Sequence, residues 1–354
     1  MENIIVKKID KEELNSFISF QYKLYKKDPN FRPELRKEQM DFFTTNPFLK
    51  EGQVSFYLAF KNNIPVGRIA KILLPKYPVM FGFFECIDDF KIVEALFNEI
   101  DENRGLIGPL NFTTNDNCGL LIEGFEYPSF NMPYNKSYYQ KFFEQYGLKK
   151  KMDLFAYYVP KKTIPEKFRK KIQEIEIQLN KAGIIVRKVD FNNFKEEVKH
   201  IVDVYNDSNS ENWGFLPISV EDGEYIAKRL KKITAPEYVY LAEKQGEFIG
   251  YLVGVPDINE IVFKNGRISI KALFQILFFK PKRIRIIILG VRKAYRQKGI
   301  AACMIEKIVQ ITHLQNIDGA EASYILENNK EMNLILRKIN GKITKKYRIY
   351  EKVQ

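Results

Sequence analysis

LGVRKAYRQKGIA, residues 289–301, joins an apolar strand-like run to a helix-like run through a basic turn that carries one glycine. The run from Ile284 to Val291 suits a buried strand, and from Ile300 to Ile311 apolar residues recur at helical spacing. A turn that feeds a helix N-terminus presents unpaired backbone N–H groups and the positive end of the helix dipole. The stretch therefore predicts an anion cradle in the turn that precedes Ile300.

The identity of that anion can be narrowed from the same residues. A P-loop requires GxxxxGK[ST], but Gly299 is followed by Ile300 and Ala301, and GxGxxG is absent from the chain. Nucleoside triphosphates and dinucleotides therefore fit poorly. Between Arg267 and Ile305 the sequence has ten Lys and Arg and no Asp or Glu, so positive charge is concentrated around the turn.

The hexamer RQKGIA resembles the R/Q-x-x-G-x-G/A signature of the GCN5-related N-acetyltransferase (GNAT) superfamily. Further motifs follow in the family's order: Asn329, then LRKING (336–341), then KKYRIYEK (345–352). The resemblance covers residues 184–352 well. It departs from the family in two places, because no proline stands near Ala294 and the helix tyrosine that reprotonates the thiolate is replaced by Leu336.

The resemblance implies acetyl-CoA or another acyl-CoA as co-substrate. The pyrophosphate would lie on the turn, and the pantetheine arm would pair with the adjoining strand as an added strand does. The expected cofactor-binding residues are Leu289, Val291, Arg296, Gln297, Lys298, Gly299, Ile300, Ala301 and Asn329. Gly290, in mid-strand, is expected to form the bulge that opens the sheet there. The alternative is that Arg296 and Lys298 are solvated charges in an ordinary turn.

Transfer to an amine needs a base, because an alkylamine has a pKa near 10.4. Glu321 and Glu327 flank the predicted strand EASYILENN, and we predict Glu327 as the base, with a surface role as its alternative. The Val291 N–H is expected to meet the thioester oxyanion. With that tyrosine missing, the thiolate is left to Tyr324, Tyr347, Tyr350 or solvent for its proton, and Tyr324 is the predicted catalytic residue among them.

The resemblance places the acceptor pocket at the segment VYNDSNSENWGFLPISVEDGEY (204–225). Its aromatic and amide side chains suit a ligand pocket, and the predicted substrate-binding residues are Tyr205, Asn206, Asn212 and Trp213. Trp213 could equally pack the loop onto the core.

The chain also repeats itself. IIVKKID (4–10) returns as IIVRKVD (184–190), and YLA (57–59) returns as YLA (240–242) in a similar two-strand context. Periods this long indicate tandem domains. We therefore expect an α+β (mixed α/β) fold with two tandem GNAT-like modules, each a mixed, largely antiparallel sheet flanked by helices. The expected boundaries are a degenerate module without a phosphate loop at 1–160, a helical connector at 161–183 and an acyl-CoA-binding catalytic module at 184–354.

An insertion precedes the coenzyme strand. In NGRISIKALFQILFFKPKRIR (265–285), Ile270, Leu273, Phe274, Leu277 and Phe278 recur at helical spacing among basic residues. This pattern is typical of an interfacial membrane helix or a lid over an apolar ligand, and a buried core helix is the alternative. Residues 267–285 therefore give an expected peripheral contact with an anionic membrane.

The two-module form also resembles, more loosely, a bacterial group of GNAT-like proteins that includes ceramide-synthase-like acyltransferases. That resemblance rests on the insertion, ENWGF (211–215), LENNKEMN (326–333) and KYRIYEK (346–352). Expected partners are therefore a small-molecule or a lipid amine. The expected reaction is acyl-CoA-dependent N-acylation of a primary amine. The alternatives are long-chain transfer to a sphingoid-like amine at the membrane surface and a non-catalytic CoA- or partner-binding protein.

Composition sets the remaining expectations. The 354 residues carry a formal net charge of +13 with 45% hydrophobic and 14% aromatic residues, which suits two ordered cores. Only the global charge favours nucleic acid, so none is expected. Three scattered cysteines argue against disulfides or a metal site. Neither a targeting segment nor a spanning run is expected, which predicts the cytoplasm, with a peripheral position at the inner face of the membrane as the alternative.

Overall fold

The computed structural model describes residues 4–51, 53–75, 77–261 and 266–353. The chain divides into two compact units, each assembled from separate parts of the sequence. Unit 1 comprises residues 1–154, 261–279 and 345–354, and unit 2 comprises residues 155–260 and 280–344. Both units are mixed α/β structures, so the expected fold class is confirmed.

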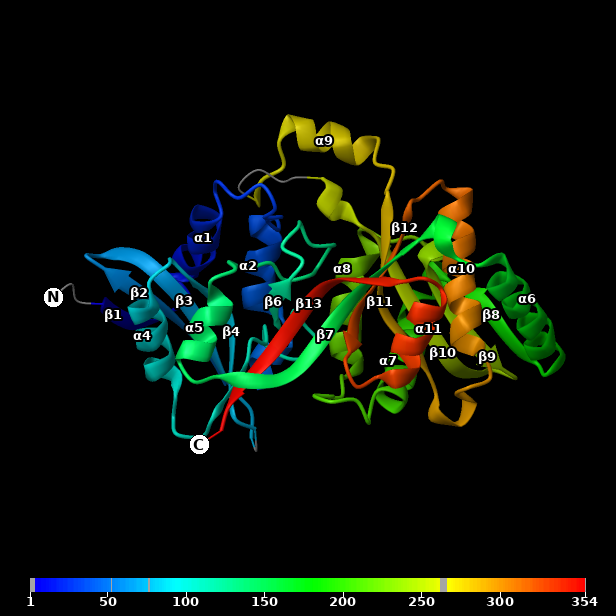
Figure 1. Ribbon diagram of the computed structural model, residues 1–354, viewed down its shortest axis with the longest axis horizontal. Helices are drawn as coiled ribbons and strands as arrows, with labels where there is room; N and C mark the ends of the chain where they lie inside the picture. Colours follow the sequence, from blue (N-terminus) through cyan, green and yellow to red (C-terminus); the bar gives the residue numbers. More distant parts are fainter. Residues whose placement is uncertain (1–3, 52, 76, 262–265, 354) are drawn as a thin grey trace. The chain divides into compact units, whose positions relative to one another are not determined.

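Unit 1 has one sheet with helices on both faces (Figure 1). Its strand order is β1-β2-β3-β4-β5-β13, with β6 also on β13, and only the β4–β5 pair is parallel among these. The strands are β1 (Ile4–Ile9), β2 (Gln53–Lys61), β3 (Ile64–Leu73), β4 (Val79–Cys86), β5 (Leu106–Gly108), β6 (Leu120–Glu123), β7 (Lys149–Pro160) and β13 (Lys342–Lys352). The last two strands each run from one unit into the other along the chain.

Two aromatic-rich cores hold unit 1 together. One face carries α4 and α5 over a core that includes Phe97, Phe143 and Tyr350, and the other carries α1 and α2, where Phe17 and Phe43 pack edge to face. The helices are α1 (Leu14–Leu24), α2 (Arg36–Thr45), α3 (Phe48–Glu51), α4 (Phe90–Ile100), α5 (Tyr139–Gln145) and α9 (Ile270–Leu277).

Unit 2 repeats this plan with the strand order β8-β9-β10-β11-β12-β7. Its strands are β8 (Ile184–Lys188), β9 (Val239–Lys244), β10 (Glu247–Pro256), β11 (Arg283–Val291) and β12 (Gly319–Leu326). Its helices are α6 (Glu166–Lys181), α7 (Phe194–Ser208), α8 (Val220–Lys231), α10 (Ile300–Leu314) and α11 (Lys330–Lys338). One core lies under α10 and α6, and a second lies under α7 on the opposite face.

The repeat extends to irregularities of the backbone. Val66 has no pairing partner in the β2–β3 ladder, and neither has Ile249 in the β9–β10 ladder. Ile249 is the residue of the second copy that corresponds to Val66. A β-bulge adds one unpaired residue and bends the strand that carries it. Its recurrence at one position of both hairpins supports duplication of a single ancestral unit.

The expected connector helix is more than a linker. Helix α6 packs through Ile172 and Leu179 into the same core as α10, so it belongs to unit 2. Within the described residues, no helix is long and apolar enough to cross a bilayer.

Candidate functional site

The sheet of unit 2 opens between β11 and β12. These parallel strands pair from Arg283 with Gly319 to Ile286 with Ala322, and both strands continue beyond the last pair. Figure 1 shows them side by side with α10 next to them. A cavity of about 170 Å³ lies at the opening and is lined by Ile286–Leu289 of β11 and Ala322–Leu326 of β12.

Side chains from both faces of the sheet line this cavity. Ile305 and Ile308 of α10 come from the core on one face, whereas Tyr251 belongs to the core under α7 on the other. The cavity therefore reaches through the gap in the sheet. Two reactants could approach one point from opposite faces.

A bulge in β11 accompanies the opening, but it is not where the sequence predicted it. Gly290 pairs regularly with Tyr251, whereas Ile287 is the extra residue between the pairs Val253–Ile288 and Gly254–Ile286. The expectation for Gly290 was therefore wrong. Glycine at position 290 instead leaves room for two side chains, because a Cβ there would lie 2.6 Å from Oη of Tyr251 and 2.4 Å from Oγ of Ser208.

The ladder fixes the direction of the backbone amides beyond the bulge. The Arg292 N–H donates to the Ile249 carbonyl (2.8 Å), and alternate residues of an antiparallel strand face alternate edges. The N–H groups of Val291 and Leu289 therefore point away from β10, toward the edge that β12 has left. Both residues were predicted to meet the pantetheine arm, and Leu289 lines the cavity.

The basic turn lies between β11 and α10 and is open to solvent. Gln297 and Gly299 both have positive φ, 62° and 87°, and Gly299 is the N-cap of α10 without any side-chain cap. Within the described part of the chain, no group accepts a hydrogen bond from the amides of Gln297 to Ala301. The predicted cradle thus has its donors available.

The charged side chains of this turn point in different directions. Arg296 donates to the Ser208 carbonyl and forms an ion pair of 3.6 Å with Glu211, so it ties the turn to the end of α7. Lys298 lies 4.9 Å from the centre of the Tyr295 ring. Lys298 is exposed and remains the cation placed to reach an anion on the turn.

A short polar chain enters the cavity from α7. Asn212 Nδ2 donates to Asn209 Oδ1 (2.9 Å), and Asn209 Nδ2 donates to Tyr251 Oη (2.9 Å). Burial raises the pKa of Tyr251 to about 12, so its hydroxyl stays protonated at neutral pH. Asn212 was predicted from the sequence, whereas Asn209 and Tyr251 were not, although Asn209 lies in the same amide-rich segment, 204–225.

The other predicted acceptor residues have different surroundings. Asn206 is occupied by the backbone of Ile218, accepting from its N–H (3.0 Å) and donating to its carbonyl (2.9 Å). Tyr205 packs near Phe215, with ring centres 6.0 Å apart. Tyr205, Asn206 and the partly buried Trp213 are not among the residues that line the cavity.

The predicted catalytic residues lie on or next to β12. Tyr324 lines the cavity, and Glu327 follows Leu326, the last lining residue of that strand. Glu321 is buried and lies 3.9 Å from Arg283. Asn329 lines the cavity while its Oδ1 caps α11 through the Met332 N–H (3.0 Å). No Asp or Glu is among the described residues that line the cavity.

Unit 1 has ionisable side chains at the positions that correspond to Tyr251 and Gly290. The register pairs Gly67 with Cys86 and Gly250 with Val291, so Arg68 and Glu85 of unit 1 correspond to Tyr251 and Gly290 of unit 2. Glu85 is fully buried, lies 4.0 Å from Arg68 and accepts hydrogen bonds from Tyr25 (2.7 Å) and Tyr139 (2.8 Å). Burial raises the pKa of Glu85.

The N-terminus of α4, the helix that follows β4, already has a carboxylate cap. The carboxylate of Asp89 caps α4 by accepting from the Lys91 N–H (3.0 Å), so a negative charge already occupies that helix N-terminus. The first turn of α4 therefore differs from that of α10, whose N-cap Gly299 has no side-chain cap. Among the described residues of both units, no cluster of His, Cys, Asp and Glu is arranged to hold a metal ion.

Comparisons with known proteins agree with this geometry. The acetyltransferase (GNAT) family model matches residues 199–337. The chain is 30% identical over 367 residues to a protein of Caulobacter vibrioides named bacterial ceramide synthase, covering 96% of this chain and 94% of the relative. It is 29% identical to Protein YghO of Escherichia coli, covering 97% and 94% of the two chains.

Solved structures give the same result for the fold. A tandem GNAT protein from the clavulanic acid biosynthesis pathway superposes with a TM-score of 0.59 at 9% identity, covering 99% of this chain and 98% of the other. The chain belongs to the GNAT acetyltransferase family, in its tandem two-module form.

Proposed function

We propose that unit 2 transfers an acyl group from a CoA thioester to a primary amine. The observation that carries the proposal is the gap between β11 and β12, entered from both faces and followed at once by a helix N-terminus with available amides. This arrangement suits a donor with a diphosphate at one end and a reactive thioester at the other.

The donor would lie along β11. Its diphosphate accepts hydrogen bonds from the amides of Gln297 to Ala301, with Lys298 adding charge. The two amides of the pantetheine arm pair with the open edge of β11 at Leu289 and Val291, as an added strand would. The thioester oxygen then lies near the Val291 N–H, which stabilises the negative charge that develops during attack.

The acceptor would enter from the α7 face, beside Asn209 and Asn212. The amine loses a proton as it attacks, and the tetrahedral intermediate collapses with release of the CoA thiolate. Glu327, at the end of β12, is our candidate for the base, acting directly or through water. Tyr251, which stays protonated, is our candidate for the acid that returns a proton to the thiolate, with Tyr324, which also lines the cavity, as the second candidate.

Thermal unfolding with acetyl-CoA, palmitoyl-CoA and a DNA oligonucleotide tests the ligand class. Binding of a thioester at about 100 times its Kd stabilises the folded protein by about 2.7 kcal/mol, and we expect no shift with DNA. Stabilisation by neither thioester would refute the proposal. Stabilisation without turnover of any amine would favour a non-catalytic CoA-binding protein instead.

Substitution of Tyr251 tests the mechanism. We expect Tyr251→Phe to lower kcat by about 100-fold with little change in the thioester affinity, because the aromatic ring remains while the proton donor is lost. Tyr240→Phe is the matched control, since Tyr240 is a buried tyrosine on the neighbouring strand of the same unit but outside the cavity. Equal rates for wild type and Tyr251→Phe would remove Tyr251 from the mechanism.

A second candidate acceptor is a long-chain lipid amine. The walls of the cavity are largely aliphatic along α10 and α11, including Ile305, Ile308 and Leu336, and a relative of similar length is named bacterial ceramide synthase. Competition between acetyl-CoA and palmitoyl-CoA, each with a sphingoid base and with a short diamine, separates the candidates. Preference for palmitoyl-CoA with the sphingoid base supports the lipid acceptor, and preference for acetyl-CoA with the diamine supports the small one.

A further inference from the structure

Helix α9 of unit 1 has its apolar side turned outward. Ile270 is 79% exposed, Phe274 59% and Phe278 77%, whereas Ala272 on the opposite side is fully buried. An ordinary surface helix buries its apolar stripe and exposes its polar residues. The buried-core interpretation of this insertion is therefore wrong for its large side chains. The side chain of Leu277, which was predicted to share this face, lies outside the described residues.

Exposed apolar side chains recur along the whole segment, and Ile270, Leu273, Phe274 and Phe278 share one face by their helical spacing. Ile268, Leu273 and Ile276 are also exposed, at 54%, 50% and 41%. Single exposed apolar side chains need no explanation, but a contiguous group of them marks an interaction surface. The helix begins at a proper N-cap, because Ser269 Oγ accepts from the Ala272 N–H (3.1 Å), so the segment is a formed helix.

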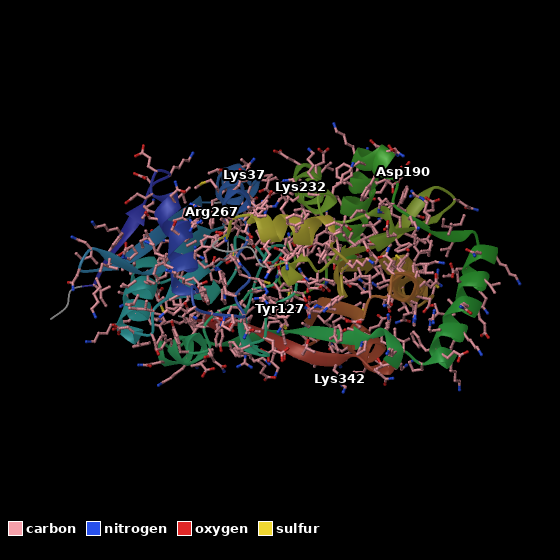
Figure 2. The ribbon with its side chains drawn as sticks, turned by 90° about the horizontal axis from the view of Figure 1, so that it is seen from above. Lys37, Tyr127, Asp190, Lys232, Arg267 and Lys342 are labelled. Atoms are coloured by element: carbon pink, nitrogen blue, oxygen red, sulfur yellow. The ribbon has the colours of Figure 1, made fainter. Side chains whose placement is uncertain are left out.

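A basic cavity lies at the base of this helix. It has a volume of about 460 Å³ and is lined by Lys23 and Lys26 of the α1 end, Arg36 of α2, and Arg267 just before α9. Figure 2 labels Arg267 at the start of the yellow segment. No Asp or Glu is among the described lining residues.

The cavity is organised by packing. The Arg36 guanidinium lies 4.2 Å from the centre of the Tyr22 ring and donates to Ser19 Oγ (2.8 Å). Tyr22 is buried and donates its hydroxyl to the Glu34 carbonyl (2.7 Å). Burial raises the pKa of Tyr22, and the charge of the neighbouring Glu34 raises it further. With four cations and no carboxylate among its described lining residues, the cavity is positive.

We propose that α9 and this cavity form a docking site for a membrane surface that contains anionic phospholipid. The apolar side of α9 enters the acyl-chain boundary, and the cavity binds a headgroup phosphate. The apolar side of α9 suits the acyl-chain region and the basic cavity suits the headgroup region, because the cations adjoin the segment that would enter the lipid. The site lies in unit 1 and does not depend on the proposed acyl transfer.

Vesicle co-sedimentation of the full chain tests the docking site. We expect binding to vesicles of phosphatidylcholine with phosphatidylglycerol and much weaker binding to phosphatidylcholine alone. Lys26→Gln with Arg267→Gln should weaken binding to the anionic vesicles about 30-fold, because each cation near such a surface contributes about a fivefold effect. Phe274→Ser with Phe278→Ser should weaken it about 100-fold or more.

A matched control distinguishes binding by the cavity cations from a general effect of net charge. Lys37→Gln with Lys91→Gln removes the same charge from exposed positions of unit 1 outside the cavity (Lys37 is labelled in Figure 2). We expect this control to keep binding within about threefold of wild type. If both double variants lose vesicle binding equally, the cavity is not a specific site.

Other occupants give different results. A soluble phosphate ligand predicts thermal stabilisation by inorganic phosphate without any vesicle binding, and that pattern would overturn the proposal. A lid over a soluble apolar ligand predicts that Phe274→Ser with Phe278→Ser leaves vesicle binding unchanged, which would also overturn it. Because every measurement here is of binding, failure of the transfer reaction would not affect the result.

Discussion

Tyr251 and Gly290 face each other across β10 and β11, and the corresponding pair in unit 1 is Arg68 and Glu85. In unit 2 the glycine leaves room for a tyrosine hydroxyl beside the gap in the sheet. In unit 1 the corresponding positions hold Arg68, which donates to the Phe17 carbonyl, and Glu85, which accepts from Tyr25 and Tyr139. At these two equivalent positions the units therefore differ, with tyrosine and glycine in unit 2 and arginine and glutamate in unit 1.

Gly299 gives the prediction at the residue scale. Gly299→Asp should abolish CoA binding, because a carboxylate at the start of α10 repels the diphosphate. The position has a φ of 87°, and a Cβ would lie 2.6 Å from Ile175 Cγ2. Any side chain therefore costs about 1 to 2 kcal/mol of stability as well.

Gly299→Ala controls for that strain. Isothermal titration with CoA should detect binding to Gly299→Ala, weakened by at most about tenfold, and none to Gly299→Asp. Circular dichroism checks that both variants are folded at the temperature of titration. If Gly299→Asp binds CoA as tightly as Gly299→Ala, the diphosphate does not lie on this turn.

Among the secondary-structure elements, the β7 and β13 strands are joined by a well-formed ion pair within unit 1. Arg348 donates to both carboxylate oxygens of Asp153, at 2.8 and 3.1 Å, and Lys150 lies 3.0 Å from the same carboxylate. Burial alone would raise the pKa of Asp153, but the hydrogen bonds from Arg348 and Lys150 outweigh it and lower the pKa. The pair therefore stabilises the fold only while Asp153 is ionised.

This shift predicts a pH-dependent stability. A depressed carboxyl pKa contributes stability above the unfolded value near 3.9, and the contribution is lost as pH falls through the folded pKa. Asp153→Asn should lower the free energy of unfolding by about 1 to 2 kcal/mol at pH 7. Urea unfolding at several pH values should show this difference shrinking below about pH 4.

The more exposed pair Lys151–Glu351 on the same strands provides the comparison. Glu351→Gln should change stability by less than about 1 kcal/mol at any pH, because exposed ion pairs contribute little. A difference for Asp153→Asn that stays constant from pH 7 to pH 3 would contradict the assignment.

At the scale of the whole molecule, each unit takes its last strand from the other half of the sequence. Residues 345–354 belong to unit 1, although the sequence analysis placed them at the end of the second copy, and β7 completes the sheet of unit 2. Tyr350 is fully buried in the unit 1 core with Phe81, Phe97 and Phe143. The end of the chain is therefore part of the first core.

Tyr350→Ala should consequently destabilise unit 1. Truncating a large buried aromatic side chain costs about 3 to 5 kcal/mol. Hydrogen exchange should show faster exchange in α4 of unit 1, with α10 of unit 2 still protected. Ile343→Ala should have little effect, because Ile343 lies on the same strand but is 40% exposed. Loss of protection in α10 equal to that in α4 would contradict the division into units.

The sequence determined the local features of this protein. Apolar periodicity located β11 and α10, Gly299 marked the turn between them, and the repeat showed the duplication, because each depends on residues close together in the chain. Tertiary structure alone decided the rest. Asn209 and Tyr251 meet only when α7 packs on β10, and the bulge falls at Ile287 because of strand register. The outward face of α9 and the exchange of last strands depend on which surfaces remain after both cores have packed, and no local pattern encodes that competition.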